Sequence, residues 1–187
     1  MEVQPEINIK KDDRDTEILR IIVSGIPTQA VAEGRPSVPL IHWRIEAVLQ
    51  HCATVNPNHH YESGVAFDTA LRPDVVASPF IQMQAFSHQG AKSRSSKFHP
   101  DFNVLVRGWT PMQMLEDLKT ANEPLHRYRY DGESSGCLYW CKRVLTRLEE
   151  IKKIPAGSAQ RLDDVVQEAR IAHANIYWIP EDRGSFY

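Results

Sequence analysis

A short run of small and polar residues leads directly into an apolar helix at Cys137. Residues 133–136 read ESSG, and residues 137–141 read CLYWC. A cysteine at the start of a helix lies at the positive end of the helix dipole, which favours a thiolate and can make a nucleophile. Cys137 and Cys141 are four residues apart, so one helix face could instead bury both as small hydrophobic side chains. The segment therefore predicts either a reactive thiol or a pair of core cysteines.

Two predicted strands carry polar side chains that could face a ligand. In the strand expected from Leu40 to Gln50, His42, Arg44 and Glu46 share one face, and apolar side chains occupy the other. That polar face is either solvated, with charge pairs between strands, or directed into a pocket. The strand expected from Phe80 to His88 repeats the pattern. Its polar side chains are those of Gln82 and Gln84, beside Phe80 and Phe86.

Metal and nucleotide sites are disfavoured by the absence of their motifs. The chain has eight histidines, but it contains no CxxC or HExxH spacing, and His59-His60 stands alone as a pair. It also has no GxGxxG sequence and no phosphate-binding loop. We therefore expect neither a metal nor a nucleotide, and no cofactor at all.

The order of periodicities predicts an α+β fold. Strands are expected over residues 18–26, 40–50, 60–71, 80–88 and 102–107, with a loop over residues 28–39. The apolar period then changes from two to about 3.6, which predicts three helices that begin near Thr110, Cys137 and Ser158. We expect a mostly antiparallel sheet of about five strands, covered by the three C-terminal helices. The apolar tail over residues 176–180 is expected to dock, as a last strand.

Composition predicts one ordinary globular domain. The chain has 187 residues, 42% hydrophobic, with a net charge of −2 and three cysteines. Residues 1–16 are polar and are expected to form a mobile lead-in to a single domain over residues 17–187. The near-neutral charge argues against a nucleic-acid partner, and the apolar runs are too short for a membrane span. We expect a soluble, cytoplasmic protein with reduced thiols. No oligomeric state follows from the sequence.

His42-Trp43 on a strand, followed much later by Cys137 at a helix start, resembles permuted papain-like enzymes. These are the enzymes related to lecithin–retinol acyltransferase and to the NlpC/P60 group. The resemblance implies that His42 is a base and Cys137 a nucleophile. The residue that normally stands beside the cysteine in those motifs is absent here. His60 is the best sequence candidate for a third residue that orients the histidine.

Three longer segments resemble a family of small fungal proteins without assigned chemistry. The segments are HWRIEAVL (42–49), RYRYDGESSGCLYWCKRVLTRLEE (127–150) and IYWIPEDRGSFY (176–187). Members of that family lie beside genes of secondary metabolism, where small cofactor-free cyclases include norbornene-forming Diels–Alderases of the sordarin type. The resemblance implies a cavity that folds a small apolar substrate, and donors that activate its carbonyl. The residues suited to donate are His42, Arg44, Tyr61, Gln82 and Gln84. The residues suited to form walls are Phe80, Phe86, Trp109, Tyr139 and Trp140.

The leading hypothesis from the sequence is a cofactor-independent cyclase or isomerase of fungal secondary metabolism. The first alternative is a Cys/His acyltransferase or hydrolase of papain-like type. The second alternative is a non-catalytic protein that binds a small molecule. The cyclase hypothesis and the Cys/His alternative differ in the role of Cys137, which is passive in a cyclase and indispensable in a thiol enzyme.

Overall fold

The computed structural model describes residues 6–32, 35–50, 61–70, 80–89, 97–120, 124–130, 136–179 and 184–186. Their secondary structure is ordered along the chain as follows: β1 (Glu6–Asn8), α1 (Lys11–Arg14), β2 (Ile18–Ala32), β3 (Arg35–Leu49), β4 (Tyr61–Ala70), β5 (Phe80–Gln89), β6 (Asp101–Asn103), α2 (Pro111–Lys119), β7 (Tyr128–Tyr130), α3 (Cys137–Glu150), α4 (Ser158–His173) and β8 (Gly184–Phe186). The fold class is α+β, as predicted.

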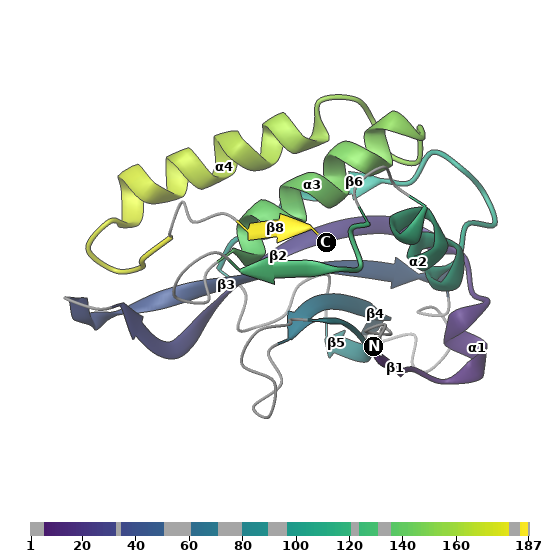
Figure 1. Cartoon of the computed structure of the whole chain (residues 1–187), viewed down its shortest axis with the longest axis horizontal. Helices are drawn as coiled ribbons and strands as arrows, with labels where there is room; N and C mark the ends of the chain where they lie inside the picture. The colour runs from purple at the N-terminus through teal and green to yellow at the C-terminus, as the bar shows by residue number, and fades with distance from the viewer. Residues whose placement is uncertain are drawn as a thin grey trace.

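Six strands form one mixed sheet in the order β1-β5-β4-β3-β2-β6. The pairs β2–β3, β3–β4, β4–β5 and β2–β6 are antiparallel, and β1 runs parallel to β5. The short strands β7 and β8 form a separate antiparallel pair. Helices α3 and α4 lie along one face of the large sheet (Figure 1). Residues 6–14, which fall in the expected lead-in, form β1 and α1.

The loop expected over residues 28–39 is wrong. Strand β2 continues to Ala32 and β3 begins at Arg35, so the two strands form one long hairpin. Their register shifts between Pro27 and Val31 and again before Ala32. Proline cannot donate to a ladder and is tolerated at such irregularities, so Pro27, Pro36 and Pro39 interrupt the pairing without ending the strands.

The helix starts follow the sequence signals closely. Thr110 and Gln113 form the predicted capping box, in which each side chain bonds to the backbone N–H of the other residue. Helix α3 begins at Cys137, as expected. At α4 the cap is Gly157, with φ of +85°, rather than Ser158, which is the first helical residue. The backbone of Gly157 is left-handed, a conformation that favours glycine. The cap therefore lies one residue before Ser158, where the sequence predicts the helix to begin.

The core lies between the sheet and its helices. It contains the odd-numbered face of β3 together with the buried stripes of α2, α3 and α4. Trp43, Ile45 and Ala47 are fully buried there, as the alternation along β3 predicts. The other face of β3 carries the polar side chains of His42, Arg44 and Glu46.

Candidate active site around Cys137

Cys137 is the first residue of a 14-residue helix whose start is held by neighbouring side chains. The Tyr128 hydroxyl donates to the carbonyl of Gly136, at 2.7 Å, and this bond is buried. The Trp140 indole N–H donates to the carbonyl of Leu125, at 2.8 Å. The segment that carries β7 is therefore tied to the first turn of α3. These bonds fix the backbone on which the thiol stands.

The Cys137 thiol hydrogen bonds to β3 at a point where, within the described residues, that strand has no paired neighbour strand on one edge. The described pairing of β3 with β4 runs from Val48↔Gly64 to Ile45↔Phe67. Two residues earlier, the backbone N–H of Trp43 donates to Cys137 Sγ, at 3.3 Å. Two residues earlier again, the N–H of Ile41 donates to the carbonyl of Trp178 in the C-terminal tail, at 3.0 Å. The thiol thus lies between β4 and the tail, where it accepts a backbone hydrogen bond from the sheet.

His42 joins the thiol to a carboxylate on the neighbouring strand. Its Nε2 lies 2.7 Å from Asp68 Oδ1, and Cys137 is close enough to the imidazole to raise its pKa. Because Nε2 is taken by the carboxylate, Nδ1 is the nitrogen available to the thiol. Ala66 pairs with Glu46, so Asp68 projects from the same face of the sheet as His42. The sheet therefore brings together Cys137, His42 and Asp68, which are separate in the sequence.

The electrostatics of this group favour a protonated imidazole. Burial is the largest single influence on His42 and favours the neutral ring. The hydrogen bonds to Asp68 and Cys137, together with the charges of both groups, outweigh burial and raise the pKa of His42 from 6.5 to about 10. At neutral pH the site therefore holds an imidazolium between the carboxyl group of Asp68 and the sulfur of Cys137. A cationic histidine beside a cysteine is the arrangement that generates nucleophilic thiolates.

The thiol is buried, whereas its two polar neighbours are partly exposed. Cys137 is 3% exposed, whereas the side chains of His42 and Asp68 are 28% and 25% exposed. A reactant in solution therefore meets the imidazole and the carboxyl group more readily than the sulfur. That position suits a histidine that transfers protons to and from a bound group.

Cys141 is a core cysteine, in contrast to Cys137. It is fully buried in the face of α3. Burial raises the pKa of the Cys141 thiol well above its ordinary value, and the charges of Cys137 and Asp68 act in the same direction. The sequence left open whether both cysteines are small hydrophobic residues. That description fits Cys141, while Cys137 has polar contacts on two sides.

The other polar residues expected on the strand faces are distributed differently. Arg44 donates from Nε and Nη2 to Glu46 Oε1, at 2.9 and 2.6 Å. Glu46 is only 1% exposed, so this pair neutralises a buried carboxylate. Gln82 pairs with Asp68 in the β4–β5 register and is half-buried, while Gln84 is exposed. Of the candidate donors with described side chains, His42 is the one that contacts the thiol.

The aromatic residues expected to line a cavity do not gather at one place. Trp140 is a residue of α3 whose side chain is buried in the core. Tyr139 is half-buried, and its ring centroid lies 6.5 Å from that of Tyr128. Trp109 is buried near the other end of α3, where its indole N–H donates to Asp117, at 2.9 Å. Tyr61, Phe80 and Phe86 lie on β4 and β5, but the structure describes only their backbone and not their side chains.

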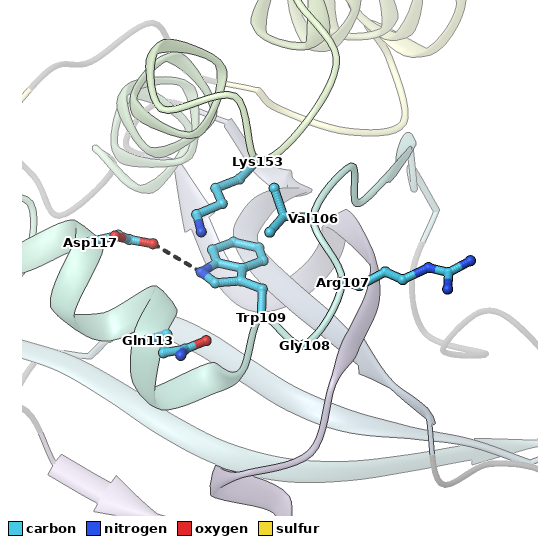
Figure 2. A pocket seen from close by; sticks show the side chains of 7 residues that line it. All are labelled: Val106, Arg107, Gly108, Trp109, Gln113, Asp117 and Lys153. Carbon is cyan, nitrogen blue, oxygen red and sulfur yellow. Dashed lines mark hydrogen bonds between the residues drawn. The ribbon is translucent and has the colours of Figure 1, made fainter.

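A shallow hollow of about 310 Å³ surrounds part of Trp109 (Figure 2). Its lining residues are Val106, Arg107, Gly108, Trp109, Gln113, Asp117 and Lys153. The Lys153 ammonium lies over the indole, 5.4 Å from the ring centre. Lys153 follows the C-terminal end of α3 and Cys137 begins it, so about 20 Å of helix separates the hollow from the thiol. The hollow is therefore not part of the group around Cys137.

Asp68 is the site residue that sequence reasoning missed. His60, the sequence candidate for this role, lies outside the described residues. Asp68 follows Phe67 in a strand that alternates, and a single acidic residue there resembles any exposed strand position. Its role depends on the register between β4 and β3, which one sequence does not reveal.

Two absences hold for the part of the chain that the structure describes. Within it, no group of three or more His, Cys, Asp or Glu side chains has an arrangement that could hold a metal ion. None of the helices described is long and apolar enough to cross a membrane.

Comparison with known proteins places the chain in a family but assigns it no activity. Residues 21–187 match the family model described as Domain of unknown function (DUF7770), so the chain belongs to that family. No curated protein and no solved structure matches the chain.

Proposed function

We propose that this member of the DUF7770 family is a cysteine-dependent acyl-transfer enzyme, either a hydrolase or an acyltransferase. One observation carries the proposal: a thiol at a helix start, held by the backbone N–H of Trp43, lies close to His42, which a carboxylate holds from the adjacent strand. Nucleophile, base and orienting group in this order are the arrangement of thiol enzymes on several unrelated folds. The roles are Cys137 as nucleophile, His42 as acid and base, and Asp68 as the residue that positions His42.

In the first half of the reaction, the thiolate of Cys137 attacks the carbonyl carbon of an ester, thioester or amide. The sulfur–carbon bond forms, and the carbonyl electron pair moves to oxygen. The backbone N–H of Cys137 has no helical partner because it lies in the first turn, so it can donate to this oxygen. As the carbonyl reforms, the imidazolium of His42 gives its proton to the leaving group. The product of this step is a thioester on Cys137.

In the second half, water or another nucleophile cleaves the thioester. The neutral imidazole removes a proton from the incoming group, which attacks the acyl carbon and releases the sulfur as thiolate. His42 is then protonated again, as it was at the start. Asp68 holds Nε2 throughout by its hydrogen bond, so that Nδ1 stays directed towards the sulfur.

The resemblance to permuted papain-like enzymes supports this proposal, because it implied His42 and Cys137 in these roles. The neighbouring carboxylate adds a third group that the resemblance lacked. The cyclase hypothesis stays a prediction. Its expected donor Arg44 is paired with Glu46, and the described hollow contains none of its expected donors.

The experiment is to measure turnover of a panel of activated esters, thioesters and anilides by wild type and by Cys137→Ala. We expect the variant to lose at least about a thousandfold in kcat/KM, because it removes the proposed nucleophile. The matched control is Cys141→Ala, which removes a buried thiol one helical turn away. Its kcat/KM should stay within a few fold of wild type, with a modest loss of thermal stability from the small cavity.

Two results would count against the proposal. One is that Cys137→Ala and Cys141→Ala reduce turnover equally, in proportion to their loss of stability. The other is that wild type turns over no member of the panel although its thiol reacts readily with small alkylating agents. The second result would favour a redox or binding role for the thiol.

A further inference from the structure

The C-terminal tail adds a strand segment to β3 directly before His42. The N–H of Trp178 donates to the carbonyl of Pro39, at 2.9 Å, and the carbonyl of Trp178 accepts from the N–H of Ile41, at 3.0 Å. This is a parallel bridge between Leu40 and Trp178. The carbonyl of Ile179 also accepts from Arg170 Nε in α4, at 3.2 Å. The tail is thus fixed to both the sheet and the helix that covers it.

The register of these bridges determines which side chains surround His42. Residues opposite one another in a ladder place their side chains on the same face, and so do residues two apart on one strand. Trp178 therefore shares a face with Leu40, and Leu40 shares it with His42. On the other side, Ile26 pairs directly with His42 in the β2–β3 register. Three apolar residues thus share the face of His42: Ile26 lies opposite it, Leu40 precedes it by two residues, and Trp178 lies opposite Leu40.

These apolar side chains are not packed into the core. Ile26, Leu40 and Trp178 are all half-buried, whereas their neighbours on the opposite face, such as Ile41 and Trp43, are fully buried. Tyr177, the residue before Trp178, packs its ring against Phe98, 5.9 Å between centroids. The backbone around Trp178 is therefore anchored, while its side chain is only half-buried.

We propose that Ile26, Leu40 and Trp178 form the acyl-binding subsite of the thiol site, and that the enzyme prefers substrates with an apolar acyl group. This inference rests on the proposed function. An acyl group bound to Cys137 must extend past His42, because the sulfur itself is almost fully covered. On one side of His42 it meets Asp68, and on the other it meets the apolar subsite. An aliphatic or aromatic acyl chain gains free energy from contact with the apolar side, whereas a charged one does not.

The test compares acylation by p-nitrophenyl acetate and p-nitrophenyl hexanoate, which share a leaving group. We expect wild type to favour the hexanoyl ester in kcat/KM by about tenfold or more, since each fully buried methylene contributes about fourfold. Trp178→Ala should reduce this preference to about threefold or less, because it removes apolar surface that the longer acyl chain would contact. Leu40→Ala, a second variant, should reduce the preference in the same direction.

The matched control is Ile176→Ala, because Ile176 is an apolar residue of the same tail that is 52% exposed. It should keep the wild-type preference. If both esters acylate Cys137 and neither Trp178→Ala nor Leu40→Ala changes their ratio, the subsite is refuted and the proposed function stands. If neither ester acylates Cys137 in wild type, the proposed function fails, and this inference fails with it.

Discussion

At the scale of single residues, the site depends on the contrast between two cysteines in one helix. Cys137 contacts a histidine and a backbone N–H of the sheet, while Cys141 lies fully buried in the face of α3. Position in the helix causes part of this difference, because the first residue lies at the positive end of the dipole. The rest comes from β3, which supplies both His42 and the N–H of Trp43.

We expect Asp68→Asn to lower kcat/KM for any acyl substrate by at least about tenfold, because the amide can neither fix the ring orientation as firmly nor stabilise the imidazolium. Steady-state kinetics near pH 7 measure the loss. Asp101→Asn is the control, since it neutralises a surface carboxylate that pairs with Arg20 at 3.5 Å, away from the thiol. Equal activity in the two variants would show that Asp68 does not act through His42.

The pH dependence of stability tests the protonated state of His42. Its pKa rises from 6.5 to about 10 in the folded protein, so folding favours the protonated ring. This stabilisation is complete below pH 6.5 and is lost as the pH rises through about 10. We expect the difference in free energy of unfolding between wild type and His42→Gln to be larger at about pH 6 than at about pH 10.5. Urea denaturation at both pH values measures it, and a difference that is constant or grows with pH would be contrary to this account.

At the scale of elements, the site lies where the pairing between β3 and β4 stops. There the first residue of α3 takes the hydrogen bond that a neighbouring strand would otherwise accept. Strand β3 uses one edge for three partners in succession: the tail at residues 39–41, Cys137 at Trp43, and β4 from Ile45 onwards. Antiparallel pairing would otherwise consume the N–H of Trp43. Because the pairing opens at this point, the thiol receives a backbone donor and a histidine from the same strand.

The start of α3 must be held in place for these contacts to form. We expect Tyr128→Phe to lower the free energy of unfolding by about 1 kcal/mol, because it removes the buried hydrogen bond to Gly136. It should also lower kcat/KM by more than Cys141→Ala does, because the carbonyl that it releases precedes the nucleophile. Urea denaturation and steady-state kinetics on the same preparation separate the two effects. A variant that loses stability but keeps full activity would show that this bond serves the fold alone.

At the scale of the whole molecule, the sequence revealed the fold class and the helix starts but only part of the candidate site. Periodicity is a local property, so the two faces of β3, the capping box at Thr110 and the start of α3 could all be predicted. The hairpin between residues 28 and 39 was missed because its prolines signal a loop, whereas here the register shifts accommodate them.

Two of the three residues of the candidate site, His42 and Cys137, were among the site residues expected from the sequence, and Asp68 was not. His42 and Cys137 were found because each stands at an unusual place, in one case a polar strand face and in the other a helix start. Asp68 was not found, because its meaning depends on the register between two strands that are distant in the sequence. The apolar subsite was missed for the same reason, since the bridge from Trp178 to Leu40 joins the last part of the chain to the third strand.

The most direct test of the central claim is to trap the acyl-enzyme. Wild-type protein is mixed with p-nitrophenyl hexanoate near neutral pH, quenched in acid and analysed by peptide mass spectrometry. We predict one hexanoyl group, bound as a thioester to Cys137 and absent from Cys141, whose formation slows at least about tenfold in His42→Gln. Protein that shows no adduct on Cys137, or an adduct that forms equally fast without His42, would contradict the assignment of a catalytic thiol.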